Sequence, residues 1–222
     1  MTAARRSSRR RDTDKMSARR PRARLRLLAA GSAGLALYAL WIRPRLLTWG
    51  ATTQETTRAY PGDELVPEPD GGATMATTLP APPEAVWSWL VQMGGDRGGW
   101  YSWDLLDNNG RPSTDRIVPE WQSLQVGQHL CTAPDGPSRF VVAVLEANRT
   151  LVLRGDYSED LDGIWGLHLR PFPGGGTRLV VRTRHRWRPR AGMWLVDLLW
   201  SEPLHFIMQT RQFHNLRARV TA

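Results

Sequence analysis

The stretch TRLVVRTRHRW, Thr177–Trp187, decides the fold, because its side chains alternate cleanly between two kinds. One set is mainly apolar or aromatic: Leu179, Val181, Thr183, His185 and Trp187. The other set is mainly basic: Arg178, Val180, Arg182, Arg184 and Arg186. Successive side chains of a β-strand point to opposite faces of its sheet. The pattern therefore predicts a strand with one buried face and one arginine-lined face that is open to solvent.

Five further strand candidates precede this stretch in the sequence. They are Ala73–Leu79, Gln128–Thr132, Ser138–Leu145, Leu151–Arg154 and Gly163–Pro171. Short turns such as Ala147-Asn148 and Pro173–Gly176 join the later strands. Such turns favour an antiparallel meander over β-α-β crossovers.

Helical periodicity appears in two main segments. Pro82–Met93 has a proline near its first turn and places Val86, Leu90 and Met93 on one face. A short helix is expected at Ser102–Leu106, and a long apolar one at Met193–Val220, with a kink or break at Pro203. The order predicts an α+β fold in which a curved antiparallel sheet wraps around a long C-terminal helix. A cavity between sheet and helix would be a natural site for a small ligand.

The net charge of the protein is concentrated at its N-terminus. The 222 residues carry 30 Lys+Arg and 21 Asp+Glu, a formal charge of +9. Residues 1–26 contain 11 of the basic and two of the acidic side chains, so they account for the whole excess. Because residues 27–222 are balanced, nucleic acid is not the expected partner. The single cysteine excludes an intrachain disulfide, and no motif has the spacing of a metal or cofactor site, so neither is expected.

Four regions follow from this distribution: a disordered basic tail at 1–26, a transmembrane or signal-anchor helix at 27–48, a linker at 49–72 and a ligand-binding domain at 73–222. A cleaved signal peptide and a soluble helix remain alternatives for the second region. If the helix spans a membrane once, the basic tail places the N-terminus in the cytoplasm and the C-terminal domain outside it. The arginines nearest the anchor are expected to contact an anionic membrane surface: Arg19, Arg20, Arg22, Arg24 and Arg26.

The densest group of candidate site residues lies in the segment RGGWYSWD, Arg97–Asp104. Flat aromatic side chains beside a carboxylate suit the mouth of an apolar pocket, although packing in the core is the simpler explanation. Two histidines, one on the apolar strand face and one on the C-terminal helix, could act as acid or base. The alternative is a buried core histidine or, for the one on the helix, a solvated histidine. The full set of pocket candidates is Trp100, Tyr101, Trp103, Asp104, Trp121, His185, His205 and Met208.

Several short strings carry a family resemblance that covers about Arg43 to Arg219. They are PGDELVP (Pro61–Pro67), APPEAVW (Ala81–Trp87), DRGGWYS (Asp96–Ser102), DRIVPEW (Asp115–Trp121) and EPLHFIM (Glu202–Met208). These strings resemble the SRPBCC or START-like superfamily, and most of all its polyketide cyclase/dehydrase and lipid-transport-like members. The resemblance implies the helix-grip fold and a hydrophobic cavity for a lipid, a polyketide-like molecule or another apolar ligand. It does not imply a reaction.

Three functions follow as hypotheses. The first is membrane-anchored binding or transfer of a hydrophobic small molecule or lipid, without catalysis. The second is a cyclase or dehydratase that uses Tyr101, Asp104 and one of the two histidines to move protons. The third is an interaction scaffold with a filled core. The presence of a cavity separates the third from the others, and convergence of proton-transfer groups inside it separates the second from the first.

Overall fold

The computed structural model describes residues 30–156 and 160–221, and the chain divides into two units, Met1–Pro44 and Arg45–Ala222. In the first unit the chain is helical from Ala30, with a π-helical turn at Tyr38–Ile42 that continues into α2 (Arg43–Leu47). No helix among the described residues is both long and apolar enough to cross a bilayer.

The expected transmembrane helix at 27–48 is therefore not supported. The physical reason is the pair of arginines, Arg43 and Arg45, in its last turns, which interrupts an apolar stretch that is already short for a bilayer core of about 30 Å. Residues 27–29 and the expected tail at 1–26, with its five arginines nearest the anchor, lie outside the described residues.

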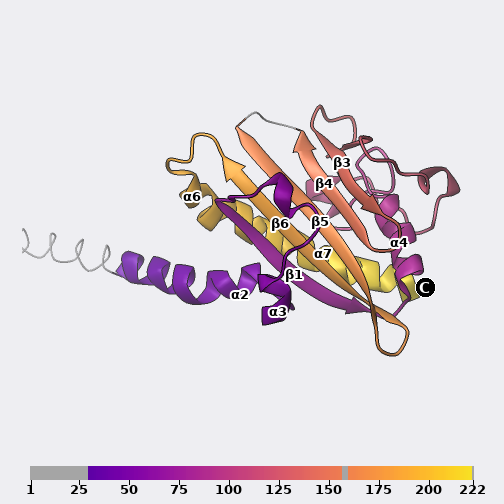
Figure 1. Ribbon diagram of the computed structural model, residues 1–222. Coiled ribbons are helices and arrows are strands. Elements are labelled where there is room, and N and C mark those ends of the chain that lie inside the picture. The colour runs from indigo at the N-terminus through magenta and orange to yellow at the C-terminus, as the bar shows by residue number, and fades with distance from the viewer. Residues whose placement is uncertain (1–29, 157–159, 222) are drawn as a thin grey trace, which may run out of the picture. The chain divides into compact units, whose positions relative to one another are not determined.

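The second unit is built on a six-stranded sheet in which all neighbouring strands are antiparallel (Figure 1). Its strands are β1 (Gly71–Leu79), β2 (His129–Cys131), β3 (Arg139–Glu146), β4 (Thr150–Asp156), β5 (Leu161–Phe172) and β6 (Gly176–Trp187). The order in the sheet is β1-β6-β5-β4-β3-β2. The first strand thus pairs with the last, and the others follow as the meander that the short turns predict.

Helices cover one face of this sheet. The helical elements after β1 are α4 (Pro83–Val91), α5 (Asp104–Asp107), η3 (Pro119–Trp121), α6 (Met193–Val196), η4 (Asp197–Ser201) and α7 (Glu202–Thr221). The long helix α7 lies across the sheet (Figure 1). This α+β arrangement fits the helix-grip fold that the resemblance implies.

The core lies between the sheet and the helices α4 and α7. Leu179 and Val181 of β6 point into it and are buried, together with Leu90 of α4 and Leu216 of α7. Removing these side chains from water is the main favourable term for folding, at about 25 cal/mol per Å² of apolar surface. The strand alternation seen in the sequence therefore identifies the inner face correctly.

Pro203 changes the form of the helix that precedes it. A proline has no N–H to donate to the residue four positions earlier, which is Leu199, and its ring crowds that carbonyl. The chain meets this constraint with the π-helical segment η4 directly before α7, so that Pro203 falls in the first turn of α7. Widened turns of this kind often occur at functional positions.

The outer face of the sheet is not open to solvent, which corrects the prediction from the alternation of β6. Residues 50–70, here called the strap, run over it and contain α3 (Thr53–Thr57) and η2 (Asp63–Leu65). The outward arginines of β6 are only 15–22% exposed at their side chains. These arginines contact polar groups of the strap. Arg178 forms an ion pair with Glu55, and Arg182 forms one with Asp63. Arg184 donates hydrogen bonds to the carbonyl oxygens of Val66 and Pro67.

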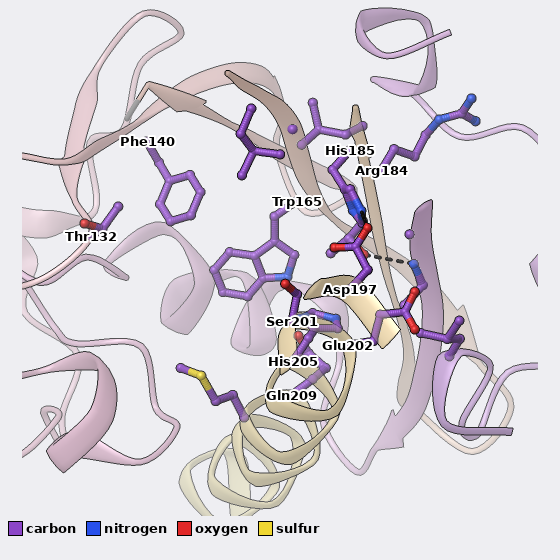
Figure 2. Close-up of a pocket in the computed structure, with 18 of the residues that line it drawn as sticks. Thr132, Phe140, Trp165, Arg184, His185, Asp197, Ser201, Glu202, His205 and Gln209 are labelled. Carbon is purple, nitrogen blue, oxygen red and sulfur yellow. Dashed lines mark hydrogen bonds and ion pairs between the residues drawn. The ribbon is translucent and has the colours of Figure 1, made fainter. Parts of the chain in front are cut away.

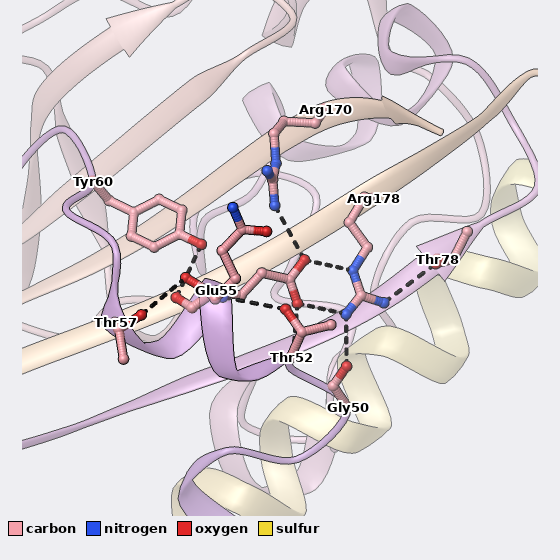
Figure 3. Close-up of polar contacts among 9 residues, drawn as sticks. Gly50, Thr52, Glu55, Thr57, Tyr60, Thr78, Arg170 and Arg178 are labelled. Carbon is pink, nitrogen blue, oxygen red and sulfur yellow. Dashed lines mark hydrogen bonds and ion pairs between the residues drawn. The ribbon is translucent and has the colours of Figure 1, made fainter. Parts of the chain in front are cut away.

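The Glu55 carboxylate accepts several hydrogen bonds in this interface (Figure 3). One of its carboxylate oxygens accepts from Arg178 Nε at 2.9 Å and from Arg170 at 3.1 Å. The other accepts from Arg178 Nη2 at 2.7 Å and from the backbone N–H of Thr52 at 2.8 Å. Because the Thr52 hydroxyl accepts from the Glu55 N–H, the same pair forms a capping box that begins α3.

The chain enters the strap beside the outer edge of β1. The N–H of Ala76 on this strand donates to the carbonyl oxygen of Trp49 at 3.0 Å, and the Trp49 ring stacks on Phe213 of α7 with centroids 6.0 Å apart. Gly50 follows with φ +72, and a Cβ there would lie 2.1 Å from the Ala76 carbonyl oxygen. Residues 49–72, expected to be a linker, are thus packed against the sheet and satisfy part of an edge strand that would otherwise invite association.

We expect Glu55→Gln to lower the free energy of unfolding by roughly 2–4 kcal/mol, because it leaves the half-buried guanidinium of Arg178 without its countercharge. Urea denaturation of the full chain at pH 7 measures the change. Glu146→Gln, at an exposed position on β3, is the matched control and should change the value by less than about 0.5 kcal/mol. Equal effects of the two substitutions would contradict the role of the strap.

The same carboxylate predicts a pH dependence. The hydrogen bond from Arg178 lowers the pKa of Glu55 from 4.5 to about 2. A depressed carboxyl pKa stabilises the folded state fully above the ordinary pKa, and this contribution is lost as pH falls toward the folded value. The difference in unfolding free energy between wild type and Glu55→Gln should therefore shrink steadily from pH 5 to pH 2. A difference that is constant over this range would contradict the assignment.

Candidate functional site

A cavity of about 350 Å³ lies between the inner face of the sheet and the helical segment formed by η4 and α7 (Figure 2). The strands β5 and β6 supply one wall, and the first turns of α7 supply the opposite one. Its volume is within the range of small-molecule sites. The lining is mostly apolar, so the cavity is suited to a ligand that is poorly soluble in water.

Aromatic rings form one side of the cavity. Trp100, Phe140 of β3 and Trp165 of β5 pack against each other, with ring centroids 5.5 Å apart for Trp100–Phe140 and Trp100–Trp165. The indole N–H of Trp100 donates to the carbonyl oxygen of Thr132 at 2.8 Å. The Trp165 Nε1 atom is buried and has no hydrogen-bond partner in the part of the chain that the structure describes. An indole N–H only donates, so a bound molecule would have to offer an acceptor there.

A histidine and a carboxylate meet in the wall formed by β6 and η4. His185 Nε2 lies 2.9 Å from Asp197 Oδ2, and the Trp187 indole N–H donates to the same oxygen at 3.0 Å. The Asp197 side chain is 5% exposed. If Asp197 accepts from Nε2–H, the Nδ1 atom of His185 carries the lone pair of the neutral ring. This arrangement fixes the orientation of the ring.

His205 of α7 also lines the cavity, but it has a different environment. Its Nε2 atom is buried and finds no partner among residues 30–156 and 160–221. Burial, and secondarily the nearby His185, lower the pKa of His205 to about 4. The ring is therefore neutral at pH 7 and can donate or accept one hydrogen bond inside the cavity.

Asp107 of α5 brings a third unpartnered group to the lining. Neither of its carboxyl oxygens has a hydrogen-bond partner within the described ranges. Burial, and then the neighbouring Asp104, raise the pKa of Asp107 to about 6. Together with Asp197 and Glu202, which are also buried, it gives the cavity three carboxyl groups.

Among the candidates taken from the sequence, four line this cavity: Trp100, His185, His205 and Met208. The structure brings them together from the loop after α4, from β6 and from α7. His185 and His205 are thus placed by strand alternation and by the apolar face of the C-terminal helix. The residue that holds His185 is Asp197, which the sequence analysis did not single out.

The other four candidates lie outside the cavity lining. Tyr101 is buried in the core, where its ring meets Trp89 edge-on at 5.8 Å and its hydroxyl accepts from Gln92 at 2.9 Å. The Trp103 ring is exposed on the surface with the guanidinium of Arg211 over it. The aromatic string is thus divided among three environments: Trp100 lines the cavity, Tyr101 lies in the core and Trp103 lies on the surface.

Asp104 and Trp121 have structural contacts. One Asp104 oxygen accepts from both the backbone N–H and the hydroxyl of Ser113, at 3.0 and 2.6 Å. The carbonyl oxygen of Trp121 accepts from the guanidinium of Arg97. Neither residue is therefore positioned to take part in chemistry inside the cavity.

The residues that sequence reasoning missed are Asp107, Trp165 and Asp197. Asp197 carried a usable signal, because it is the only charged residue within MWLVDLLW, Met193–Trp200, and a lone carboxylate in an apolar helical run needs a partner. Asp107 follows two leucines that are themselves exposed, so the local pattern gave no sign of its burial. Within the described residues, no group of three or more His, Cys, Asp or Glu side chains could hold a metal ion.

Comparisons with known proteins give weak structural similarities. No family model matches the chain, and no curated protein sequence matches it. Among solved structures, protein MLL2253 from Mesorhizobium loti has 17% identity and a TM-score of 0.46, over 68% of this chain and 97% of that one. CalU16 from Micromonospora echinospora has 18% identity and a TM-score of 0.35, over 68% and 88%. DynU16, from the dynemicin biosynthetic locus, has 16% identity and a TM-score of 0.41, over 67% and 48%.

We expect Asp107→Asn to raise the free energy of unfolding at pH 8 by roughly 1–3 kcal/mol, because the wild-type carboxyl must ionise where water cannot reach it. The raised pKa means that this cost is absent below the ordinary value of 3.8, builds up as pH rises from there to about 6 and is complete above that value. Urea denaturation at pH 4 and pH 8 measures the gain. The exposed Asp115→Asn is the control and should show no pH-dependent gain. A loss of stability at pH 8 in Asp107→Asn would contradict this account of the group.

Proposed function

We propose that the second unit binds an uncharged, largely apolar small molecule in the cavity between β5, β6 and α7. One observation carries this proposal: an aromatic-lined cavity contains buried polar atoms, on Trp165, His205 and Asp107, that have no partner among the described residues. An unpaired buried donor or acceptor costs about 1–3 kcal/mol, and a ligand with matching groups would remove that cost.

The apolar lining would supply most of the affinity. A ligand that buries about 200 Å² of apolar surface gains on the order of 5 kcal/mol at about 25 cal/mol per Å². Polar atoms on the ligand would then determine its orientation. Trp165 calls for an acceptor such as a carbonyl oxygen, whereas neutral His205 takes either a donor or an acceptor.

The charges around the cavity favour a ligand without negative charge. Asp107, Asp197 and Glu202 are buried acidic residues in the lining. Arg184 is the arginine among the lining residues, and its guanidinium is engaged on the outer face by the strap. An anion in the cavity would therefore meet carboxyl groups without a facing arginine, and a fatty-acid carboxylate should bind poorly.

We expect Ser201→Phe to reduce the affinity for Nile red, an uncharged environment-sensitive dye, by at least about tenfold, because the ring would fill the cavity that Ser201 lines. Dye fluorescence in a titration of the full chain measures binding. Ser123→Phe, at an exposed loop position, is the matched control and should bind the dye as the wild type does. Equal binding by Ser201→Phe and wild type would contradict the location of the site.

A second candidate function, proton transfer on the bound molecule, rests on the His185–Asp197 pair. Of the groups first considered for a cyclase or dehydratase, Tyr101 and Asp104 lie outside the cavity lining, while His185 and His205 are part of it. His185 Nδ1 would take a proton from a carbon next to a carbonyl group, and the enolate oxygen would accept from the Trp165 indole N–H. Asp197, 2.9 Å from Nε2, would hold the ring in the orientation that this step needs. General-base catalysis of this kind contributes about 10²–10⁴-fold.

The test is deuterium incorporation into a phenyl-substituted 1,3-diketone in D₂O, followed by NMR. The wild type should accelerate exchange over buffer, and His185→Gln and Asp197→Asn should each reduce the acceleration by at least about 100-fold. His214→Gln, at an exposed position on α7, should leave it unchanged. Exchange at the buffer rate in the wild type would leave binding alone as the proposed function.

A further inference from the structure

The outer side of the cavity wall carries an exposed apolar surface. Trp194 of α6 and Trp200 of η4 are 61% and 69% exposed, although such side chains are usually buried. Four aliphatic side chains of the same helical stretch are also exposed. We call these six residues the apolar ridge: Trp194, Leu195, Val196, Leu199, Trp200 and Ile207.

The ridge and the cavity are the two sides of one helical segment. Asp197 and Leu198 turn inward and are buried, while Leu199 and Trp200, which follow directly, turn outward. Ser201 and His205 again face the cavity. The segment that forms one wall of the cavity therefore also carries the exposed ridge.

Charge indicates what covers the ridge. The loop before α6 exposes Arg188 and Arg190, of which Arg190 also pairs with Asp70 at 3.0 Å. Residues 1–26 add a net charge of +9 to the same chain. Tryptophan, leucine and arginine together are the composition of segments that lie in the headgroup region of a membrane. Basic residues are attracted to anionic lipids, and a second copy of this chain would bring the same positive charge.

We propose that the apolar ridge docks on the surface of an anionic lipid bilayer, with Trp194 and Trp200 inserted at the boundary between headgroups and acyl chains. Nothing in this contact requires a membrane-spanning helix. The proposal goes beyond the proposed function, because it concerns the outside of the wall and does not depend on a ligand in the cavity.

The test is flotation of the full chain with vesicles of phosphatidylcholine alone and of phosphatidylcholine with 30% phosphatidylglycerol. The wild type should bind the anionic vesicles at least about tenfold more tightly than the neutral ones. The double substitution Trp194→Ser and Trp200→Ser should reduce binding to anionic vesicles by at least about tenfold. The basic residues of 1–26 are unchanged in the variant, so the loss reports on the ridge and not on the tail.

The matched control is Trp103→Ser with Leu105→Ser, which removes two exposed apolar side chains elsewhere on the surface and should bind vesicles as the wild type does. Melting curves establish that both double variants are folded. Unchanged vesicle binding by the ridge variant would overturn the proposal. So would a wild-type dimer that the ridge variant converts to a monomer, because the occupant would then be a second copy. Ser201→Phe should still bind vesicles, which separates this test from that of the cavity.

Discussion

The pairing of the β6 arginines with the strap is the interaction on which the rest of the second unit depends. Guanidinium groups on the face of a central strand must meet water or partners, and here the carboxylates of Glu55 and Asp63 meet them. This pairing holds residues 50–70 on the outer face and fixes the path of the chain from Trp49 around the edge of β1. The sheet is thereby covered on both faces, although only the inner face belongs to the main core.

The same alternation places the chemistry on the other face of β6. His185 lies between two of the arginines in sequence, and it points toward η4 because they point away. The π-helical form of η4, which accommodates Pro203, brings the buried carboxylate of Asp197 to the imidazole ring and leaves Trp200 outside. The widened turn thus connects the cavity wall to the apolar ridge, so the proposed ligand site and the proposed docking surface share one short segment.

Sequence reasoning reached the elements whose evidence is local. The alternation in β6, the short turns and the apolar face of the last helix gave the α+β fold, the inner face of the sheet and two cavity histidines. It failed where a partner lies far away in sequence, because Glu55 and Asp63 look like solvated loop residues until Arg178 and Arg182 are placed beside them. Within the aromatic string at Trp100–Trp103, only Trp100 lines the cavity. Apolar rings gather in a core as readily as in a pocket, and periodicity does not separate the two.

The cavity as the place where a ligand binds is the central claim, and hydrogen–deuterium exchange of the full chain with and without Nile red tests it most directly. Bound dye should slow exchange in the segments that line the cavity, which are residues 161–165 of β5, 183–187 of β6 and 197–209 of η4 and α7. Exchange in the strap, on the opposite face, should stay the same. Slower exchange confined to the strap or to the helix at 30–42, with the cavity segments unchanged, would contradict the account.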